Sequence, residues 1–268
     1  MHFKRFFKFK PNNNSLFIIF NDKKVLFDLE EKTFIFDEAY LNFENYDLEI
    51  IGIAEDDGKN IYAVDVTSTN FNYKEQGYKS LIDYDLRFIL TSLSNNEINL
   101  IGRANQLLHW IKSNKYCGYC GSAKKFNDEE QALFCDCNKI MIYPSISPCV
   151  LALIQKGNQI LLARNALFPE GLFSALAGFI EVSETAEETI EREIFEEVSL
   201  KVKNIKYFGS QSWPFPSQLM LAYTCEFDSG EIEVDGQEIV EAKWFDLNNL
   251  PNIPPNSTLS GRLINSCI

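Results

Sequence analysis

The sequence contains no uninterrupted run of about 18 apolar residues, the length that a membrane-spanning helix requires. Its longest strong apolar cluster, Leu16 to Phe20, has only the length of a strand. A signal peptide is not expected, because the basic residues from Lys4 to Lys10 are followed by Pro11 and an asparagine run instead of an apolar segment. We therefore expect a cytoplasmic protein that does not associate with membranes.

Basic residues are outnumbered, with 25 Lys and Arg against 38 Asp and Glu, which gives a net charge of −13. Such a chain repels polyanions, so non-specific nucleic-acid binding through a basic face is not expected. The hydrophobic content of 46% is ordinary for a soluble protein with a buried core. A length of 268 residues indicates about two domains, with one or three as alternatives.

The cysteines do not form the even, widely spread set of a disulfide framework, since there are seven of them and four fall close together. The clustered four, Cys117, Cys120, Cys135 and Cys137, indicate a metal site, with a redox pair as the alternative. The others are expected to be small buried or surface residues; they are Cys149, Cys225 and Cys267.

Three zones follow from the hydrophobic pattern: 1–111 with β-rich runs and then helices, 112–144 with the cysteines, and 145–268 with alternating strands and helices. In the first zone we expect strands at 16–20, 25–29, 33–36, 48–53 and 61–66, a hairpin turn at 56–59, and helices at 82–93 and 97–111, the second capped by Asn95 or Asn96. In the last zone we expect strands at 149–154, 160–164, 204–208, 219–227 and 242–245, a glycine loop at 177–179, a helix at 185–198 and a short helix after Pro255.

The helix at 185–198 is strongly acidic. Thr185 and Glu188 fit a capping box, and residues 190, 194 and 198 form one apolar stripe. Glu193, Glu196 and Glu197 are then expected to share an exposed face. A solvated acidic face is the simpler interpretation, but like charges four residues apart destabilise a helix. Three carboxylates that converge near a single basic residue, Arg192, favour a site for Mg²⁺ or Mn²⁺.

This stretch resembles the Nudix box, the sequence signature of the Nudix hydrolases. The matching residues are Gly178, Glu184, Arg192, Glu193, Ile194, Glu196, Glu197 and Leu200. Ser199 replaces the box's late glycine, where a left-handed helix cap is expected, at a cost of about 1 kcal/mol.

The resemblance implies metal-dependent hydrolysis of a nucleoside diphosphate linked to another group, through an activated water. Glu193, Glu196 and Glu197 are the implied catalytic carboxylates, with one able to serve as base. Arg192 is implied to orient a glutamate, and Glu184 to be a supporting carboxylate.

A second array, SQSWPFPSQLM at 210–220, resembles the substrate motif of bacterial NADH pyrophosphatases within the same superfamily. Ser212 stands in place of a proline, and Gln218 stands where a serine is expected. The prolines would stiffen a platform on which flat rings can stack, although a proline-stiffened loop with buried aromatics is the alternative. The candidate substrate-binding residues here are Gln211, Ser212, Trp213, Pro214, Phe215, Pro216, Ser217 and Gln218.

The same resemblance implies further positions. Glu238 and the backbone carbonyl of Ala177 are implied metal ligands, alongside Glu193 and Glu197. Phe179 is implied to stack on the nicotinamide together with Tyr143 of a second subunit, which implies a homodimer with shared sites. Glu130 corresponds to a substrate-contact position.

The cysteine zone resembles a zinc ribbon in which four thiolates close a structural Zn²⁺ site. The second half reads Cys-x-Cys instead of Cys-x-x-Cys, with Asn138 at the usual ligand position. We expect Cys137 to be the fourth ligand, and the backbone must bend or bulge for its side chain to reach the metal. A DNA-binding ribbon is the alternative that the acidic charge disfavours.

The expected fold is α+β, with a β-rich N-terminal domain, a zinc ribbon, and a C-terminal Nudix α/β/α sandwich built on a mixed sheet. The implied reaction splits NADH or NAD⁺ into nicotinamide mononucleotide and AMP, and the family also removes NAD caps from RNA 5′ ends. The alternatives are a Nudix hydrolase of another dinucleotide, such as ADP-ribose or diadenosine polyphosphate, and a non-catalytic dinucleotide sensor.

Overall fold

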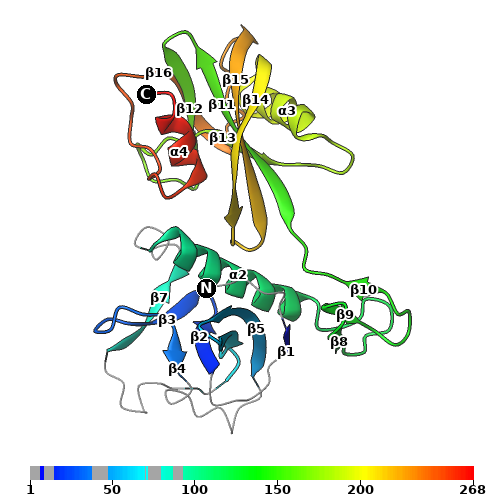
Figure 1. Cartoon of the computed structure of the whole chain (residues 1–268). Helices are drawn as coiled ribbons and strands as arrows, with labels where there is room; N and C mark the ends of the chain where they lie inside the picture. The colour runs from blue at the N-terminus through cyan, green and yellow to red at the C-terminus, as the bar shows by residue number, and fades with distance from the viewer. Residues whose placement is uncertain (1–6, 9–14, 38–47, 70, 72–79, 87–92) are drawn as a thin grey trace. The chain divides into compact units, whose positions relative to one another are not determined.

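The computed structural model of the chain describes residues 7–8, 15–37, 48–69, 71, 80–86 and 93–268. It divides into two compact units (Figure 1): Met1–Ser145 with Pro214–Pro216, and Ile146–Trp213 with Ser217–Ile268. Among the described residues, no helix combines the length and apolarity needed to cross a membrane.

The first unit is built on a sheet with α2 (Asn95–Ser113) against one face. Residues of β2 alternate between the two faces: Ile18 and Phe20 pack with α2, and Phe17 and Ile19 pack in a second cluster on the other side. Parallel pairing of β2 with β6 makes the sheet mixed. Its described strands, in the order β1-β5-β6-β2-β3-β7 with β4 beside β2, are β1 (Phe7–Lys8), β2 (Ser15–Asn21), β3 (Lys24–Asp28), β4 (Phe36–Asp37), β5 (Glu49–Asp56), β6 (Lys59–Asp65) and β7 (Leu81–Asp85).

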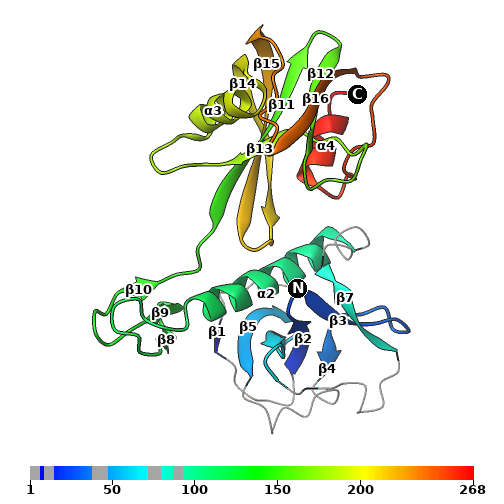
Figure 2. The ribbon, with the colours of Figure 1, turned by 180° about the vertical axis from the view of Figure 1, so that it is seen from behind.

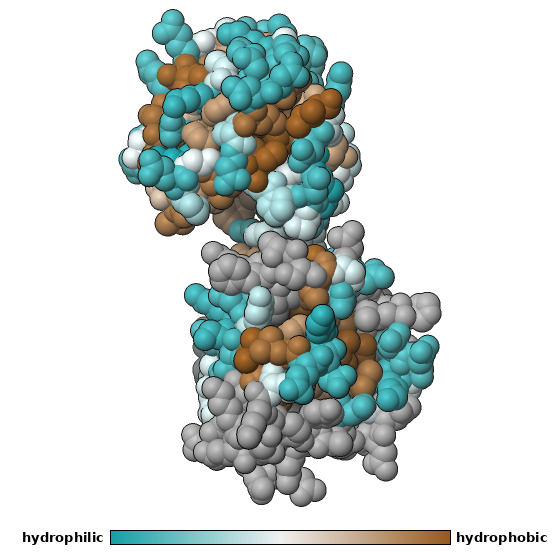
Figure 3. Space-filling model, turned by 90° about the vertical axis from the view of Figure 1, so that its left-hand side faces the viewer, coloured by the Kyte–Doolittle hydropathy of each residue, from teal (hydrophilic) through white to brown (hydrophobic). Residues whose placement is uncertain are grey.

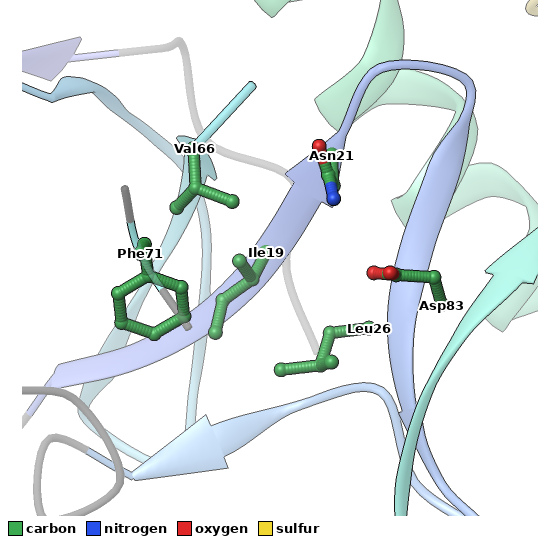
Figure 4. Close-up of a pocket in the computed structure, with 6 residues that line it drawn as sticks. All are labelled: Ile19, Asn21, Leu26, Val66, Phe71 and Asp83. Atoms are coloured by element: carbon green, nitrogen blue, oxygen red, sulfur yellow. The ribbon is translucent and has the colours of Figure 1, made fainter. Parts of the chain in front are cut away.

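A small void lies on the sheet face away from α2 (Figure 4). It measures about 10 Å³, room for at most one water molecule. This void is therefore too small to hold a ligand larger than water. The void is lined by Ile19, Asn21, Leu26, Val66, Phe71 and Asp83.

The cysteine zone forms a small three-stranded antiparallel sheet of β8 (Lys125–Asn127), β9 (Ala132–Phe134) and β10 (Met141–Ile142). Leu133 is buried in the same apolar cluster as α2, and Phe126 packs against that cluster. The ribbon and the N-terminal sheet therefore share one hydrophobic core.

The second unit is a sandwich in which α3 (Ala186–Val198) and α4 (Leu259–Asn265) cover opposite faces of one sheet (Figures 1 and 2). Along β11, Val150 and Ala152 face the α3 side, while Leu151 and Leu153 face the α4 side. β11 runs parallel to β15 and antiparallel to its other neighbours, which confirms the expected mixed sheet. The strand order is β14 (Leu200–Trp213), β15 (Gln218–Gly230), β11 (Ser147–Lys156), β12 (Gln159–Asn165) and β16 (Ile239–Asp246), with β13 (Leu176–Phe179) beside β11.

Several expected elements are wrong. The helix predicted at 82–93 begins too early, because residues 82–85 form a strand in which β7 pairs with β3; Leu86 is helical, and residues 87–92 lie outside the described part. The strand predicted at 33–36 shrinks to Phe36–Asp37, and the glycine loop predicted at 177–179 is strand β13. The N-cap of α2 is Ser94, which forms a capping box with Glu97.

The molecular surface mixes hydrophobic and hydrophilic residues on the face drawn in Figure 3. Scattered exposed apolar side chains are normal on a folded protein, because polar atoms are too few to cover it. Exposure alone therefore marks no site, and the candidate sites below rest on specific geometry.

Candidate functional site

Helix α3 begins at the predicted capping box and ends at the predicted left-handed residue. Thr185 Oγ1 accepts the N–H of Glu188 at 3.2 Å, and the Glu188 carboxylate accepts the N–H of Thr185 at 2.8 Å. The apolar stripe predicted at 190, 194 and 198 is fully buried. The helix ends at Ser199, which has φ 59° and ψ 26°, the left-handed conformation predicted where a glycine is usual.

The expectation that the carboxylates share an exposed face is wrong. Glu196 is exposed, but the Glu193 side chain retains 17% of its accessible surface, and Glu197 is buried at 5%. Residues 233–235 run along the end of α3, with the N–H of Asp235 donating to Glu197 O at 3.2 Å. The helix therefore turns two of its carboxylates inward, away from bulk water.

One carboxylate oxygen of the cluster is buried without a hydrogen-bond donor among the described residues. Glu197 Oε2 has no hydrogen-bond partner in the described part of the chain. Burial, together with the nearby charges of Glu193 and Glu238, raises the pKa of Glu197 to about 8. Burial also raises the pKa of Glu193. A buried carboxylate oxygen without a donor, with two further carboxylates nearby, fits a hard divalent cation that supplies positive charge.

Strand β13 lies directly beneath this cluster. A Cβ placed on Gly178 would lie 1.9 Å from Glu193 Cδ and 2.1 Å from its Oε1. Only a glycine leaves room for the carboxylate at this point. The preceding residue, Ala177, is exposed on the same strand.

Arg192 forms ion pairs with three glutamates around the cluster. Its Nε and Nη2 donate to the two oxygens of Glu184 at 2.6 and 2.9 Å, a bidentate pair. This pairing lowers the pKa of Glu184 to about 2. Nη1 lies 2.9 Å from Glu193 Oε1 and 3.0 Å from Glu196 Oε2. Nη2 also donates to Phe179 O at 3.0 Å, which ties the helix to β13.

Glu238 immediately precedes β16. The Asp235 carboxylate accepts the N–H groups of Glu238 and Ile239 at 2.9 and 2.8 Å, which fixes the turn. The charge of Glu238 contributes to the raised pKa of both Glu193 and Glu197, so it lies near these carboxylates.

The second array forms a β-hairpin of β14 and β15. Strand register aligns Gln211 with Met220, Met220 with Cys149 of β11, and Cys149 with Phe179 of β13. Directly paired residues project to the same face of a sheet, so these four form one row across four strands. Met220 packs in the apolar cluster beneath α4, which assigns the row to that face.

Trp213 pairs with Gln218, and each lies two residues from the pair of Gln211 and Met220 on its own strand. Both side chains therefore project to the same face as the row. Sequence reasoning missed Cys149 and Met220, which lie in the row between Phe179 and Gln211. The alternation of residues along β11 could have indicated Cys149, but the pairing of β11 with β15 could not be predicted.

Gln211 is fixed by one hydrogen bond, from its Nε2 to Ser257 O at 3.0 Å. Its Oε1 is buried without a partner in the described chain. The amide therefore presents a free acceptor beside the row.

The turn of the hairpin belongs to the first unit. Asn105 Nδ2 donates to Pro214 O at 2.7 Å, and Phe215 packs against the apolar cluster around α2. Ser212 and Pro216 are exposed, and Ser217 O accepts the N–H of Ser147 at 2.8 Å. Trp213 thus belongs to the second unit and Phe215 to the first, although the sequence motif groups them.

Tyr143 and Glu130 pair with each other in the first unit. Tyr143 Oη donates to Glu130 Oε2 at 2.8 Å, and this bond raises the pKa of the phenol. Tyr143 is half-exposed on the ribbon.

The four ribbon cysteines come together. Their Sγ atoms all lie within 4.8 Å of one another, with Cys117 and Cys137 at 3.6 Å and Cys120 and Cys135 at 3.5 Å. Four sulfurs at 2.3 Å from a tetrahedral zinc lie about 3.8 Å apart, so the donor set fits Zn²⁺. Lys139 adopts a positive φ of 55° and its N–H donates to Cys135 O. This turn provides the predicted bend and brings the Cys137 thiol into the cluster.

Residues 145–265 match the family model described as NUDIX domain. The chain is 42% identical over 165 residues to the NAD-capped RNA hydrolase NudC of Pseudomonas syringae pv. syringae, covering 62% of this chain and 59% of that one. It is 40% identical over 190 residues to the NAD-capped RNA hydrolase NudC of Escherichia fergusonii, covering 71% and 70%. The matched region spans less than two thirds of the Pseudomonas relative's length.

Proposed function

Because this chain belongs to the NUDIX family, we propose that it is a divalent-metal-dependent hydrolase of NADH and NAD⁺, and that NAD-capped RNA is a substrate of the same site. Water cleaves the pyrophosphate, and the products from the free dinucleotide are nicotinamide mononucleotide and AMP. The observation that carries the proposal is the carboxylate cluster around the buried, unpartnered Oε2 of Glu197.

The carboxylates of Glu193, Glu197 and Glu238 and the carbonyl of Ala177 would hold Mg²⁺ or Mn²⁺. The bound ion supplies charge neutralisation at the pyrophosphate and a more acidic attacking water. Arg192 keeps Glu193 and Glu196 in position through its ion pairs and is itself fixed by Glu184. The metal-ligating carboxylates therefore need little rearrangement before reaction.

The row on the α4 face supports the dinucleotide as substrate. Phe179 retains 47% of its accessible surface and offers a ring for stacking on the nicotinamide, with Trp213 on the same face of the sheet. The unpartnered Oε1 of Gln211 can accept a hydrogen bond from a carboxamide N–H, a group that the nicotinamide carries and a sugar lacks.

We also propose that Tyr143 completes the stacking site of a second subunit, so that the active protein is a homodimer. Its bond to Glu130 fixes the phenol from one side and leaves the half-exposed ring available. The ribbon cysteines would hold a structural Zn²⁺.

A substrate panel tests the proposal. NADH, NAD⁺, NAD-capped RNA, ADP-ribose and diadenosine tetraphosphate are incubated with Mg²⁺ or Mn²⁺, and the products are separated by chromatography. We expect nicotinamide mononucleotide from the first three. Glu197→Gln should abolish the reaction, while Glu191→Gln, an exposed position on the same helix, serves as its control. Absence of hydrolysis with either ion, or equal activity of the two variants, would refute the proposal.

A further inference from the structure

A second and larger cavity lies within the first unit, where β5, the end of α2 and the ribbon meet. Its volume is about 230 Å³, and every lining residue belongs to the first unit. Pockets for drug-sized ligands measure roughly 300–1,000 Å³, so this one suits a smaller group. Its apolar wall includes Ile51, Ile111, Phe126 and Leu133.

Two lysines stand at the rim of this cavity on adjacent backbone segments. Tyr116 and Ala123 form an antiparallel bridge, and the N–H of Lys124 donates to Lys115 O at 2.9 Å. Lys115 and Lys124 are therefore direct cross-strand neighbours, and both line the cavity. Like charges placed opposite each other are destabilising unless an anion is present between them.

Among the described residues that line the cavity, Glu49 is the acidic one. Glu49 Oε1 lies 3.3 Å from Lys115 Nζ, and within the described residues Lys124 has no ion pair. The described lining residues, with two lysines and one glutamate, therefore carry one net positive charge. Its sequence context agrees, since the segment from Ile98 to Asn127 contains five Lys and Arg residues and no Asp or Glu, in a chain of net charge −13.

We propose that this pocket binds one nucleotide of the RNA that follows an NAD cap. The base lies against Phe126 and the neighbouring aliphatic side chains, and its phosphate lies between Lys115 and Lys124. RNA repeats a flat base and an anionic phosphate at each step, which is the combination that the pocket complements. Free NADH has no nucleotide beyond the adenylate, so this pocket distinguishes capped RNA from the free dinucleotide. The inference rests on the proposed function.

The test compares two double variants with the same change in charge. Lys115→Gln/Lys124→Gln alters the pocket, whereas Lys125→Gln/Lys139→Gln removes two ribbon lysines that pair with Asp136 and do not line it. Hydrolysis of NADH and of an NAD-capped ten-nucleotide RNA is measured for both. Fluorescence anisotropy follows binding of the uncapped RNA over a range of salt concentrations. Zinc content and Tm verify that both variants fold.

The pocket variant should lose about tenfold in kcat/KM for capped RNA, corresponding to the loss of about 1.4 kcal/mol at one contact. It should keep NADH hydrolysis within about twofold. Its salt dependence of RNA binding should flatten by about 0.7 in log–log slope, the value for one phosphate of a single strand. The control variant should keep the wild-type slope.

Equal losses in the two variants, or an unchanged slope in the pocket variant, would overturn the inference and leave an apolar acid or an acidic peptide as the better ligand. If the wild type hydrolyses neither NADH nor capped RNA, the proposed function fails instead. The RNA-binding slopes still decide whether the pocket contacts phosphate.

Discussion

Replacing Gly178 by alanine should inactivate the enzyme without unfolding it. The added Cβ would stand 1.9 Å from Glu193 Cδ, whereas ordinary van der Waals contact begins near 3.4 Å. The Glu193 carboxylate must therefore retreat by about 1.5 Å from its position over β13. A misplacement of about 1 Å in a catalytic group can cost about 100-fold in rate. We expect kcat/KM for NADH to fall by about 100-fold or more.

The strand itself tolerates the change. Gly178 is not among the positive-φ glycines, so alanine can adopt its backbone conformation. Burying the methyl group also requires no new polar group to be desolvated. We expect the Tm of the metal-free protein to change by only a few degrees, while the apparent Kd for Mn²⁺ rises.

Gly209→Ala provides the matched control. Gly209 lies on β14 in the same unit, also lacks a positive φ, and has no atom within 4 Å of an added Cβ. This variant should retain wild-type kinetics. The measurements are NADH hydrolysis, Mn²⁺ titration and thermal unfolding of both variants. If Gly178→Ala keeps activity within about threefold, Glu193 does not act from its observed position.

Four further outcomes are expected. Glu197→Gln should raise the Tm of the metal-free protein, because it removes a buried carboxylate whose pKa is raised to about 8. It should also abolish the increase in Tm that Mg²⁺ causes in the wild type; if that increase persists, the ion binds elsewhere. Trp213→Ala should weaken the binding of NADH far more than that of a nucleoside diphosphate sugar, since stacking contributes about 1–3 kcal/mol per ring. If both substrates lose the same affinity, the residue has a structural role. Cys137→Ser should lower bound zinc below one per chain by elemental analysis, whereas full retention of tight zinc would exclude the thiol as a ligand. The pKa of Glu184 lies below its ordinary 4.5, so the ionised carboxylate stabilises the fold above pH 4.5, and this stabilisation is lost as the pH falls toward 2. The Tm difference between wild type and Glu184→Gln should therefore shrink over that range. A constant difference would contradict the ion pair.

Local signals predicted the helix that carries the carboxylates. The capping box at Thr185 and the stripe of Ile190, Ile194 and Val198 fix both its start and its buried face. The same periodicity could not predict that Glu197 is buried, because burial depends on contacts from distant parts of the chain, such as residues 233–235, which hydrogen-bond to the end of α3. The cysteine spacing predicted a metal cluster, and the structure supplies the turn that Cys137 needs.

Non-local pairing accounts for what sequence reasoning missed. Residues 82–85 have no clear strand signal, and they become a strand because β3 offers an unpaired edge. The row from Phe179 to Gln211 depends on the register of four strands, of which β11 and β15 are separated by a long connection. Residue patterns within one strand do not determine such a register.

The C-terminal end of α3 has an electrostatic consequence of its own. A helix carries partial negative charge at this end, which is usually balanced by lysine or arginine, yet the last turn of α3 has no basic residue and contains Glu196 and Glu197. The helix dipole therefore adds to the repulsion between the carboxylates. A cation bound there would act as the missing basic residue of the last turn. Backbone amides in this turn should exchange hydrogen with solvent faster in the metal-free protein and slow markedly when Mg²⁺ binds, while the capped first turn changes little.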